Sequence, residues 1–126
     1  MIDPNVIQGL ANLRVTGEDS LLERLLVMFL KTASERINSM KTSVASLNRL
    51  QLRADAHALK SSAFRLGATE LASQCQSLES LIDTTHSASE IIDMVKTLES
   101  THLIIEKELQ EILASLSQAS ENGRRP

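Results

Sequence analysis

The stretch ADAHALKSSAFRLGATELASQCQSLE, residues 54–79, decides the fold of this chain. Small and aliphatic residues recur in it every three or four positions, which is the spacing of one helix face, both before and after a single glycine. The face before the glycine contains Ala56, Leu59, Ala63 and Leu66, and the face after it contains Leu71, Cys75 and Leu78. Gly67 between them is typical of a residue that ends a helix. We therefore predict two helices that run antiparallel on either side of a tight turn.

Apolar faces of the same period lie on both sides of this pair. The first runs from about Asp19 to Leu47 and contains Leu22, Leu26, Phe29, Ala33, Ile37, Met40, Val44 and Leu47. Another follows the predicted turn TTHSASE and contains Val95, Leu98, His102, Ile105, Leu109, Ile112 and Leu116. Ile82 extends the face of the helix before that turn. Four substantial helices are therefore expected.

Local signals place the ends of these helices. Asn48 is expected to cap the helix before Gly67, and Asp3 with Pro4 begins a short leading helix. Thr16 with Asp19 and Ser87 with Glu90 resemble capping boxes. The last residues, SQASENGRRP, have no apolar period, so we expect a disordered tail over residues 118–126 and a single domain over residues 1–117.

The composition agrees with helices packed on helices. The chain has 126 residues, of which 42% are hydrophobic but only 2% aromatic, and it contains four Gly and two Pro. A β domain of this size normally has more aromatic and β-branched residues at period two. The predicted fold is all-α, an antiparallel up-down four-helix bundle with a short extra N-terminal helix. A repeat solenoid fits less well, because helices of unequal length do not stack as equivalent units.

Charge and residue usage exclude several functions. A formal net charge of −3 without a basic stripe argues against nucleic-acid binding. One cysteine and three scattered histidines do not suggest a metal site or a disulfide. No apolar run approaches the roughly 20 residues of a membrane span, and no signal peptide is expected at the start. We expect a monomeric cytoplasmic protein without membrane contact.

His57 is the candidate functional residue. It lies one position past the apolar residue Ala56, so it is expected beside the buried face of its helix. Four side chains share its exposed side, namely Arg53, Lys60, Ser61 and Phe64. A small residue at position 61, one turn from the ring, would let another protein reach the imidazole.

Glu79 supplies the second part of this site. It follows the apolar residue Leu78, at the edge of the next helix, about as far after the turn as His57 lies before it. Because each helix rises about 1.5 Å per residue, the two side chains should lie level. A carboxylate there can accept the Nδ1–H of His57 and leave Nε2 unprotonated and facing outward, as a nucleophile. Lys60 can then balance a phosphoryl group on Nε2.

Each of these residues also has a simpler interpretation. A lone histidine on a helix is most often an ordinary surface residue, as we expect for His86, and His102 is expected to be partly buried with its hydrogen bonds satisfied. Cys75 is expected to be a small core residue. Phe64 can either fold back into the core or lie exposed as a contact residue. The conjunction of His57, Lys60 and Glu79 favours a functional site.

The motif resembles that of the histidine-containing phosphotransfer (HPt) domain of bacterial phosphorelays. In outline the family has A-H-x-L-K-G/S-S/A, a Leu-Gly-Ala turn, and then Leu, Cys and Leu-Glu. This chain has AHALKSSA at residues 56–63, LGA at 66–68, Leu71, Cys75 and then LE at 78–79. The match is dense over about 25 residues, and the helix order agrees over almost the whole domain. Ser61 stands where the family often has glycine, and Phe64 is larger than the usual residue.

The resemblance implies a phosphocarrier without an ATP site or a cofactor of its own. Nε2 of His57 would take a phosphoryl group from the Asp of a response-regulator receiver domain, which also supplies Mg²⁺, and would pass it to another receiver. Lys60 would balance the phosphoryl charge and Glu79 would orient the ring. Partners would be receiver domains and a sensor or hybrid histidine kinase, docked over Arg53, Ser61, Phe64 and Gln76.

Two other functions remain open. One is a degenerate HPt-like bundle that binds receivers as an interaction module without accepting phosphate. The other is a helical hydrolase that uses His57 with Glu79, although no oxyanion or metal machinery is visible in the sequence. The intact His57, Lys60 and Glu79 favour the phosphocarrier over both. The sequence does not indicate which receivers, kinase or signal it would serve, or whether it is a separate protein or the end of a hybrid kinase.

Overall fold

The computed structural model describes residues 1–11, 21–84 and 87–124, and these form five helices. Helix α1 spans Pro4–Ala11, α2 spans Leu21–Ala45, α3 spans Arg49–Arg65, α4 spans Thr69–Thr84 and α5 spans Ala88–Arg124. Two of the predicted features, the Thr16–Asp19 capping box and His86, lie outside the described residues. Among the described residues, no helix is both long and apolar enough to cross a membrane.

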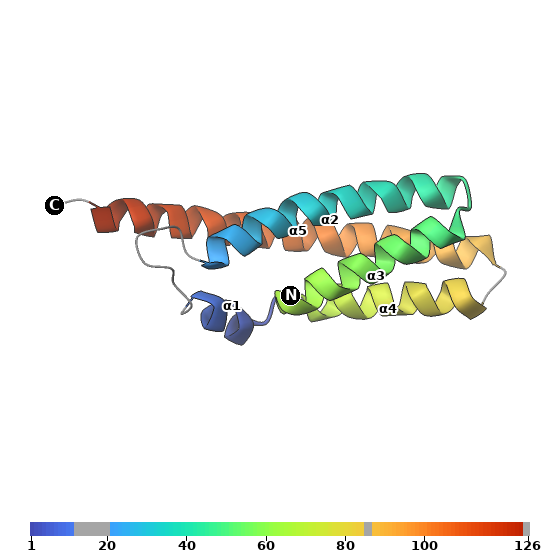
Figure 1. Cartoon of the computed structure of the whole chain (residues 1–126), viewed down its shortest axis with the longest axis horizontal. Coiled ribbons are helices and arrows are strands. Elements are labelled where there is room, and N and C mark those ends of the chain that lie inside the picture. The colour runs from blue at the N-terminus through green and yellow to red at the C-terminus, as the bar shows by residue number, and fades with distance from the viewer. Residues whose placement is uncertain (12–20, 85–86, 125–126) are drawn as a thin grey trace.

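The four long helices form an antiparallel bundle. Figure 1 shows them side by side, with α1 at one end next to the N-terminus. Helix α3 packs against α2 and α4, and α5 closes the ring by packing against the same two helices, so that α3 and α5 lie diagonally opposite. The predicted all-α up-down bundle with a short N-terminal helix is confirmed.

Gly67 turns the chain between α3 and α4 and also holds α1 in place. It has a φ of 75°, a left-handed conformation that suits glycine, and the N–H of Ala68 donates to the carbonyl of Ala63 at 2.9 Å. A Cβ added at Gly67 would lie 3.0 Å from the Cβ atoms of both Asp3 and Val6. The Asp3 N–H in turn donates to the Gly67 carbonyl at 2.9 Å. The predicted helix end is confirmed, and the missing side chain also lets α1 approach.

Asn48 caps the start of α3, as predicted: its Oδ1 accepts the N–H of Gln51 at 3.1 Å. The prediction that Leu47 continues the apolar face of α2 is wrong. Leu47 has a φ of 55° and is 53% exposed, whereas Ser43 is buried. Leu47 leaves the helical face because α2 ends at Ala45 and the chain has to reverse within a few residues before Asn48.

The core is built from the predicted apolar faces. It is formed by buried aliphatic side chains and one phenylalanine from all four long helices, among them Leu22, Leu26, Phe29, Met40, Leu52, Leu59, Leu71, Leu78, Leu98, Ile105 and Leu109. Ile82, Ile112 and Leu116, also predicted on these faces, are partly buried and pack against it. The apolar periodicity therefore predicted the core well, apart from the helix ends.

A buried carboxylate in α3 was not predicted. Asp55 is 0% exposed, and its Oδ1 accepts from Arg36 Nη1 of α2 at 2.9 Å and from Gln51 Nε2 at 3.2 Å. The hydroxyl of Ser39, also in α2, donates to Oδ2. Several donors therefore compensate a charge that would be costly to bury alone. This cluster links α3 to α2 two residues before His57.

Helix α5 continues past residue 117 to Arg124, although the sequence predicts the start of a tail at residue 118. A helix that has already formed gains one backbone hydrogen bond for each residue it adds, so it can extend without an apolar face. The domain boundary at residue 117 stays a prediction.

His102 is more deeply buried than expected. It is 4% exposed, and its Nε2, 3.8 Å from Glu106 Oε2, has no hydrogen-bond partner among the described residues. The prediction that its hydrogen bonds are satisfied is therefore wrong for this atom. Burial lowers the pKa of His102 below its usual 6.5, although the charges of Glu106 and Glu99 act in the opposite direction.

We predict that the domain becomes less stable as the pH falls below about 6.5. In this window the unfolded chain protonates His102 before the folded chain does, so unfolding becomes more favourable, by at most about 1.4 kcal/mol per pH unit. Urea unfolding between pH 7.5 and 5.5 measures the slope. His102→Leu, which has similar size and no charge, should reduce the slope. Equal slopes in the two proteins would show that other groups govern the acid response.

Candidate functional site

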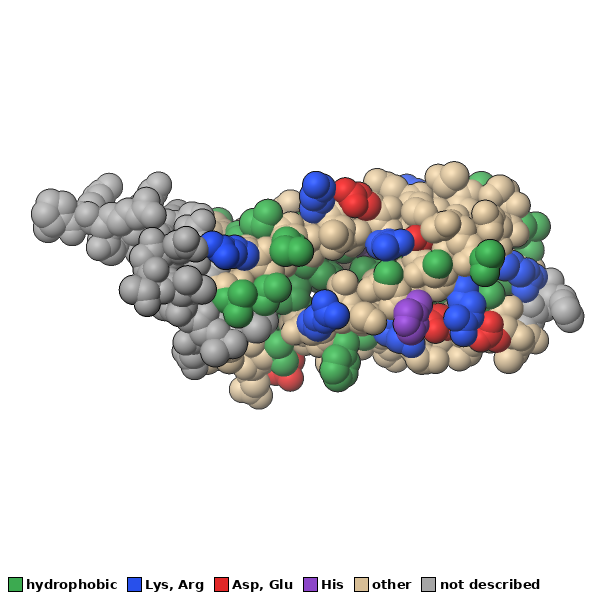
Figure 2. Space-filling view, viewed as in Figure 1, with side chains coloured by type: hydrophobic (Ala, Val, Ile, Leu, Met, Phe, Trp, Pro, Cys, Tyr) green, Lys and Arg blue, Asp and Glu red, His purple; other side chains and the backbone are tan. Residues whose placement is uncertain are grey.

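His57 lies in the middle of α3, with its side chain 62% exposed. The preceding residue, Ala56, is completely buried, so His57 stands beside the buried face as predicted. Figure 2 shows a histidine side chain, in purple, at the surface among acidic and basic side chains. The ring is therefore positioned by a helix interior and remains open to a partner.

The buried carboxylate of Glu79, in α4, lies beneath this ring. Its side chain is 7% exposed, and its Oε1 lies 3.5 Å from His57 Nδ1 and 2.9 Å from Lys60 Nζ. The contact with Nδ1 is longer than the usual N–H···O range of about 2.7–3.2 Å, so Glu79 acts on the ring mainly through its charge. A negative charge at Nδ1 favours the proton on that nitrogen and directs Nε2 outward. Glu79 is buried, whereas the sequence suggested an edge position.

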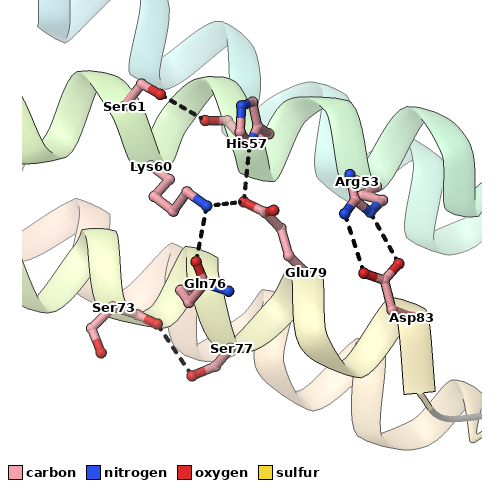
Figure 3. A network of polar contacts seen from close by, with 9 residues as sticks. All are labelled: Arg53, His57, Lys60, Ser61, Ser73, Gln76, Ser77, Glu79 and Asp83. Carbon is pink, nitrogen blue, oxygen red and sulfur yellow. Dashed lines mark hydrogen bonds and ion pairs between the residues drawn. The ribbon is translucent and has the colours of Figure 1, made fainter.

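Lys60 joins the two helices at this point. Its Nζ donates to Gln76 Oε1 at 2.9 Å and pairs with Glu79, and its side chain is 25% exposed (Figure 3). The ammonium group is therefore held between two α4 side chains, close to the imidazole. A phosphoryl group on Nε2 would compete with Glu79 for this cation.

The pairing of α3 with α4 has a regular register. His57 and Glu79 lie equally far on either side of Ala68, and so do Lys60 and Gln76. One turn farther from the α3–α4 connection, Arg53 and Asp83 continue the same symmetry. The structure thus brings together the predicted residues of α3 and α4 through the geometry of a single antiparallel pair.

Asp83 is a partner of Arg53 that the sequence reasoning missed. Arg53 donates from Nε to Asp83 Oδ1 at 3.0 Å and from its Nη2 to Oδ2 at 3.2 Å, as Figure 3 shows. The hydrogen bond from Arg53 lowers the pKa of the Asp83 carboxyl, and the same bond raises the pKa of the guanidinium. Extending the His57–Glu79 register by one turn would have revealed this pair. A contact of Arg53 with another protein stays a prediction.

Ser61 and Phe64 lie on the same exposed side of α3 as His57. The Ser61 hydroxyl donates to the His57 carbonyl at 3.3 Å, so it projects little from the helix. Phe64 is 72% exposed, which decides between the two orientations left open by the sequence. An exposed aromatic ring two turns from the histidine is a suitable contact residue for another protein.

Cys75 is a core residue, as predicted. It is completely buried, and burial, with a further contribution from the charge of Glu79, raises the pKa of its thiol to about 12. The thiolate, which is the nucleophilic form of cysteine, is therefore rare near neutral pH.

The arrangement supplies an accessible imidazole nitrogen, a carboxylate at the other ring nitrogen and a nearby cation. It suits the transfer of an anionic group to and from Nε2. Within the described ranges, no three His, Cys, Asp or Glu side chains gather as a metal centre would require. Together, the helical bundle and this exposed histidine favour the phosphocarrier class of protein.

Comparison with protein families agrees with this class. The family model of the Hpt domain matches residues 24–120, which is most of the chain and includes all of α3 and α4 and most of α2 and α5. The chain therefore belongs to the Hpt domain family, whose role is histidine phosphotransfer in phosphorelays. Searches of curated proteins and of solved structures gave no significant match.

Proposed function

We propose that this chain is a phosphorelay carrier that receives a phosphoryl group on His57 from the Asp of one receiver domain and donates it to the Asp of another. The observation that supports the proposal most is the contact of the buried Glu79 with Nδ1 of an imidazole that is itself 62% exposed. This geometry leaves Nε2 accessible and places a negative charge close to the other ring nitrogen.

The transfer step needs little from the bundle itself. The lone pair of Nε2 attacks the phosphorus of the aspartyl phosphate, an N–P bond forms, and the P–O bond breaks with its electrons returning to the Asp carboxylate. The proton stays on Nδ1, where the charge of Glu79 favours it. Mg²⁺ held by the receiver would balance the phosphate charge before transfer, and Lys60 would take over part of that role afterwards.

Docking would use the face that carries His57. Phe64 and Met28 are exposed apolar residues on α3 and α2, at 72% and 61% exposure. Between these helices runs a groove of about 720 Å³, which we call the α2–α3 groove. A receiver that covers His57 can bury this apolar surface, as expected for a protein–protein contact. Ser61 and Gln76, which are both exposed, would lie within the same contact.

A transfer assay tests the proposal. The domain is incubated with purified phosphorylated receiver domains from the same genome, and the phosphoryl group is located by ³¹P NMR and mass spectrometry. We expect an acid-labile phosphoryl group on Nε2 of His57 that a second receiver removes. Stable binding of receivers without labelling would instead indicate the degenerate interaction module.

Glu79→Gln should slow transfer without abolishing it. The amide keeps the size of the side chain but loses the charge that faces Nδ1 and Lys60. Carboxylates that orient metal-bound histidines contribute about 10- to 100-fold, and we expect a loss of similar size here. Glu79→Ala should lose as much activity and also some stability, because the side chain is buried. If ¹⁵N NMR shows that the wild-type ring carries its proton on Nε2, Glu79 does not have the orienting role.

A further inference from the structure

The α2–α3 groove lies next to the helix face that carries His57, and charged side chains line both of its edges. Its floor is apolar and includes the buried side chains of Phe29 and Leu59. Its α3 wall contains Ala58, the residue after His57, so the groove and the phosphotransfer face are continuous. Figure 2 shows hydrophobic side chains in the hollow between the two helices and basic side chains along both of its edges.

Three cations of α2 and α3 are already paired. Arg36 pairs with Asp55 at 2.9 Å, Arg53 with Asp83 at 3.0 Å and Lys60 with Glu79 at 2.9 Å. To contact a carboxylate of another protein, each of these cations would have to share or break its ion pair within this domain.

Arg65 differs from these three cations. It is exposed on the α3 edge of the groove, and no ion pair is recorded for it within the part of the chain that the structure describes. It lies eight residues after His57, or about 12 Å along the helix axis. A standard protein interface covers about 800 Å² on each partner, so a receiver docked over His57 can also reach Arg65. The acidic rim residue Glu35 lies on the opposite, α2 edge.

We propose that Arg65 is a specificity-determining residue that selects receivers carrying a carboxylate beside the apolar surface that covers the groove. The inference rests on the proposed function, because it concerns the partner of the same histidine. A cation without an ion pair can attract a partner's carboxylate without giving up a contact inside its own domain. The carboxylate would face Arg65 on the α3 edge, because the α2 edge carries Glu35, and the cation beside it, Arg36, is already paired with Asp55.

The test uses a receiver that exchanges phosphate with wild-type His57. Arg65→Glu should lower the association rate constant about 10-fold at low salt, and the loss should shrink as salt screens the charge over a Debye length of about 10 Å at 0.1 M. Arg65→Gln should show a smaller loss. The hydrolysis rate of the phosphohistidine should be unchanged in both variants, because Arg65 does not contact the site.

Lys107→Glu is the matched control. Lys107 is exposed on α5, diagonally opposite α3, and its reversal changes the net charge by the same amount. A double-mutant cycle with Asp→Lys and Glu→Lys variants of the receiver should identify one acid whose reversal restores the binding of Arg65→Glu. Equal losses in Arg65→Glu and Lys107→Glu, or a loss that salt does not reduce, would overturn the assignment to Arg65 alone. Failure of every receiver to label wild-type His57 would reject the proposed function and this assignment with it.

Discussion

The His57→Gln variant is expected to accept no phosphoryl group under conditions in which the wild type is labelled within its normal reaction time. Glutamine has no nitrogen lone pair that can attack phosphorus, and no other described histidine is placed to substitute. The His102 ring is 4% exposed, so a receiver cannot reach its Nε2. His86 lies outside the described residues, and its labelling is tested directly by this variant.

The fold should survive this substitution. The His57 side chain is largely exposed and lies within α3, where glutamine is a good helix former. Circular dichroism and urea unfolding should therefore be close to wild type, while ³²P transfer from a labelled receiver is lost. A His102→Leu control should still be labelled. Acid-labile label that persists in His57→Gln would place the acceptor elsewhere and would remove the basis of the proposed mechanism.

Much of this site followed from the sequence because helical geometry leaves little freedom. If Gly67 ends one helix, a constant rise per residue places Glu79 level with His57, and in the structure His57 Nδ1 and Glu79 Oε1 are 3.5 Å apart. The same reasoning applies to Lys60 and Gln76, although only Lys60 was assigned a role beside the ring. Periodicity predicts which residues share a level and a face with good accuracy.

The features that the sequence did not reveal depend on burial and on single side-chain partners. Asp55 reads as an ordinary polar helix residue, and only the positions of Arg36 and Ser39 on α2 make its burial possible. Glu79 is buried because Lys60 crosses from α3 to pair with it. Leu47 departs from the apolar face because the reversal of the chain takes priority over the burial of one leucine. The spacing of residues along the sequence does not reveal contacts of this kind between side chains of different helices.

Ser61→Arg should lower phosphotransfer by at least about 100-fold, the size of loss expected when reacting atoms are displaced by roughly 1 Å. Ser61 lies one turn after His57 on the exposed side of α3, and its hydroxyl folds back onto the His57 carbonyl at 3.3 Å. In the wild type, the side chain at position 61 therefore projects little from the helix beside the His57 ring. An arginine there would project into the space that a receiver's active site must occupy for an approach of about 3–3.5 Å between Nε2 and phosphorus.

Control measurements can show whether Ser61→Arg impairs receiver docking, the chemical step or the folding of the domain. Arginine is a strong helix former at an exposed position, so circular dichroism and the unfolding midpoint should stay near wild-type values. Ser61→Ala removes the hydroxyl without adding bulk and should transfer phosphate almost normally. Titration calorimetry should show that receiver binding weakens in Ser61→Arg together with transfer. If Ser61→Arg binds and transfers like the wild type, the receiver approaches from another side of the bundle, and the assignment of Phe64 and Gln76 to the docking face would have to be withdrawn as well.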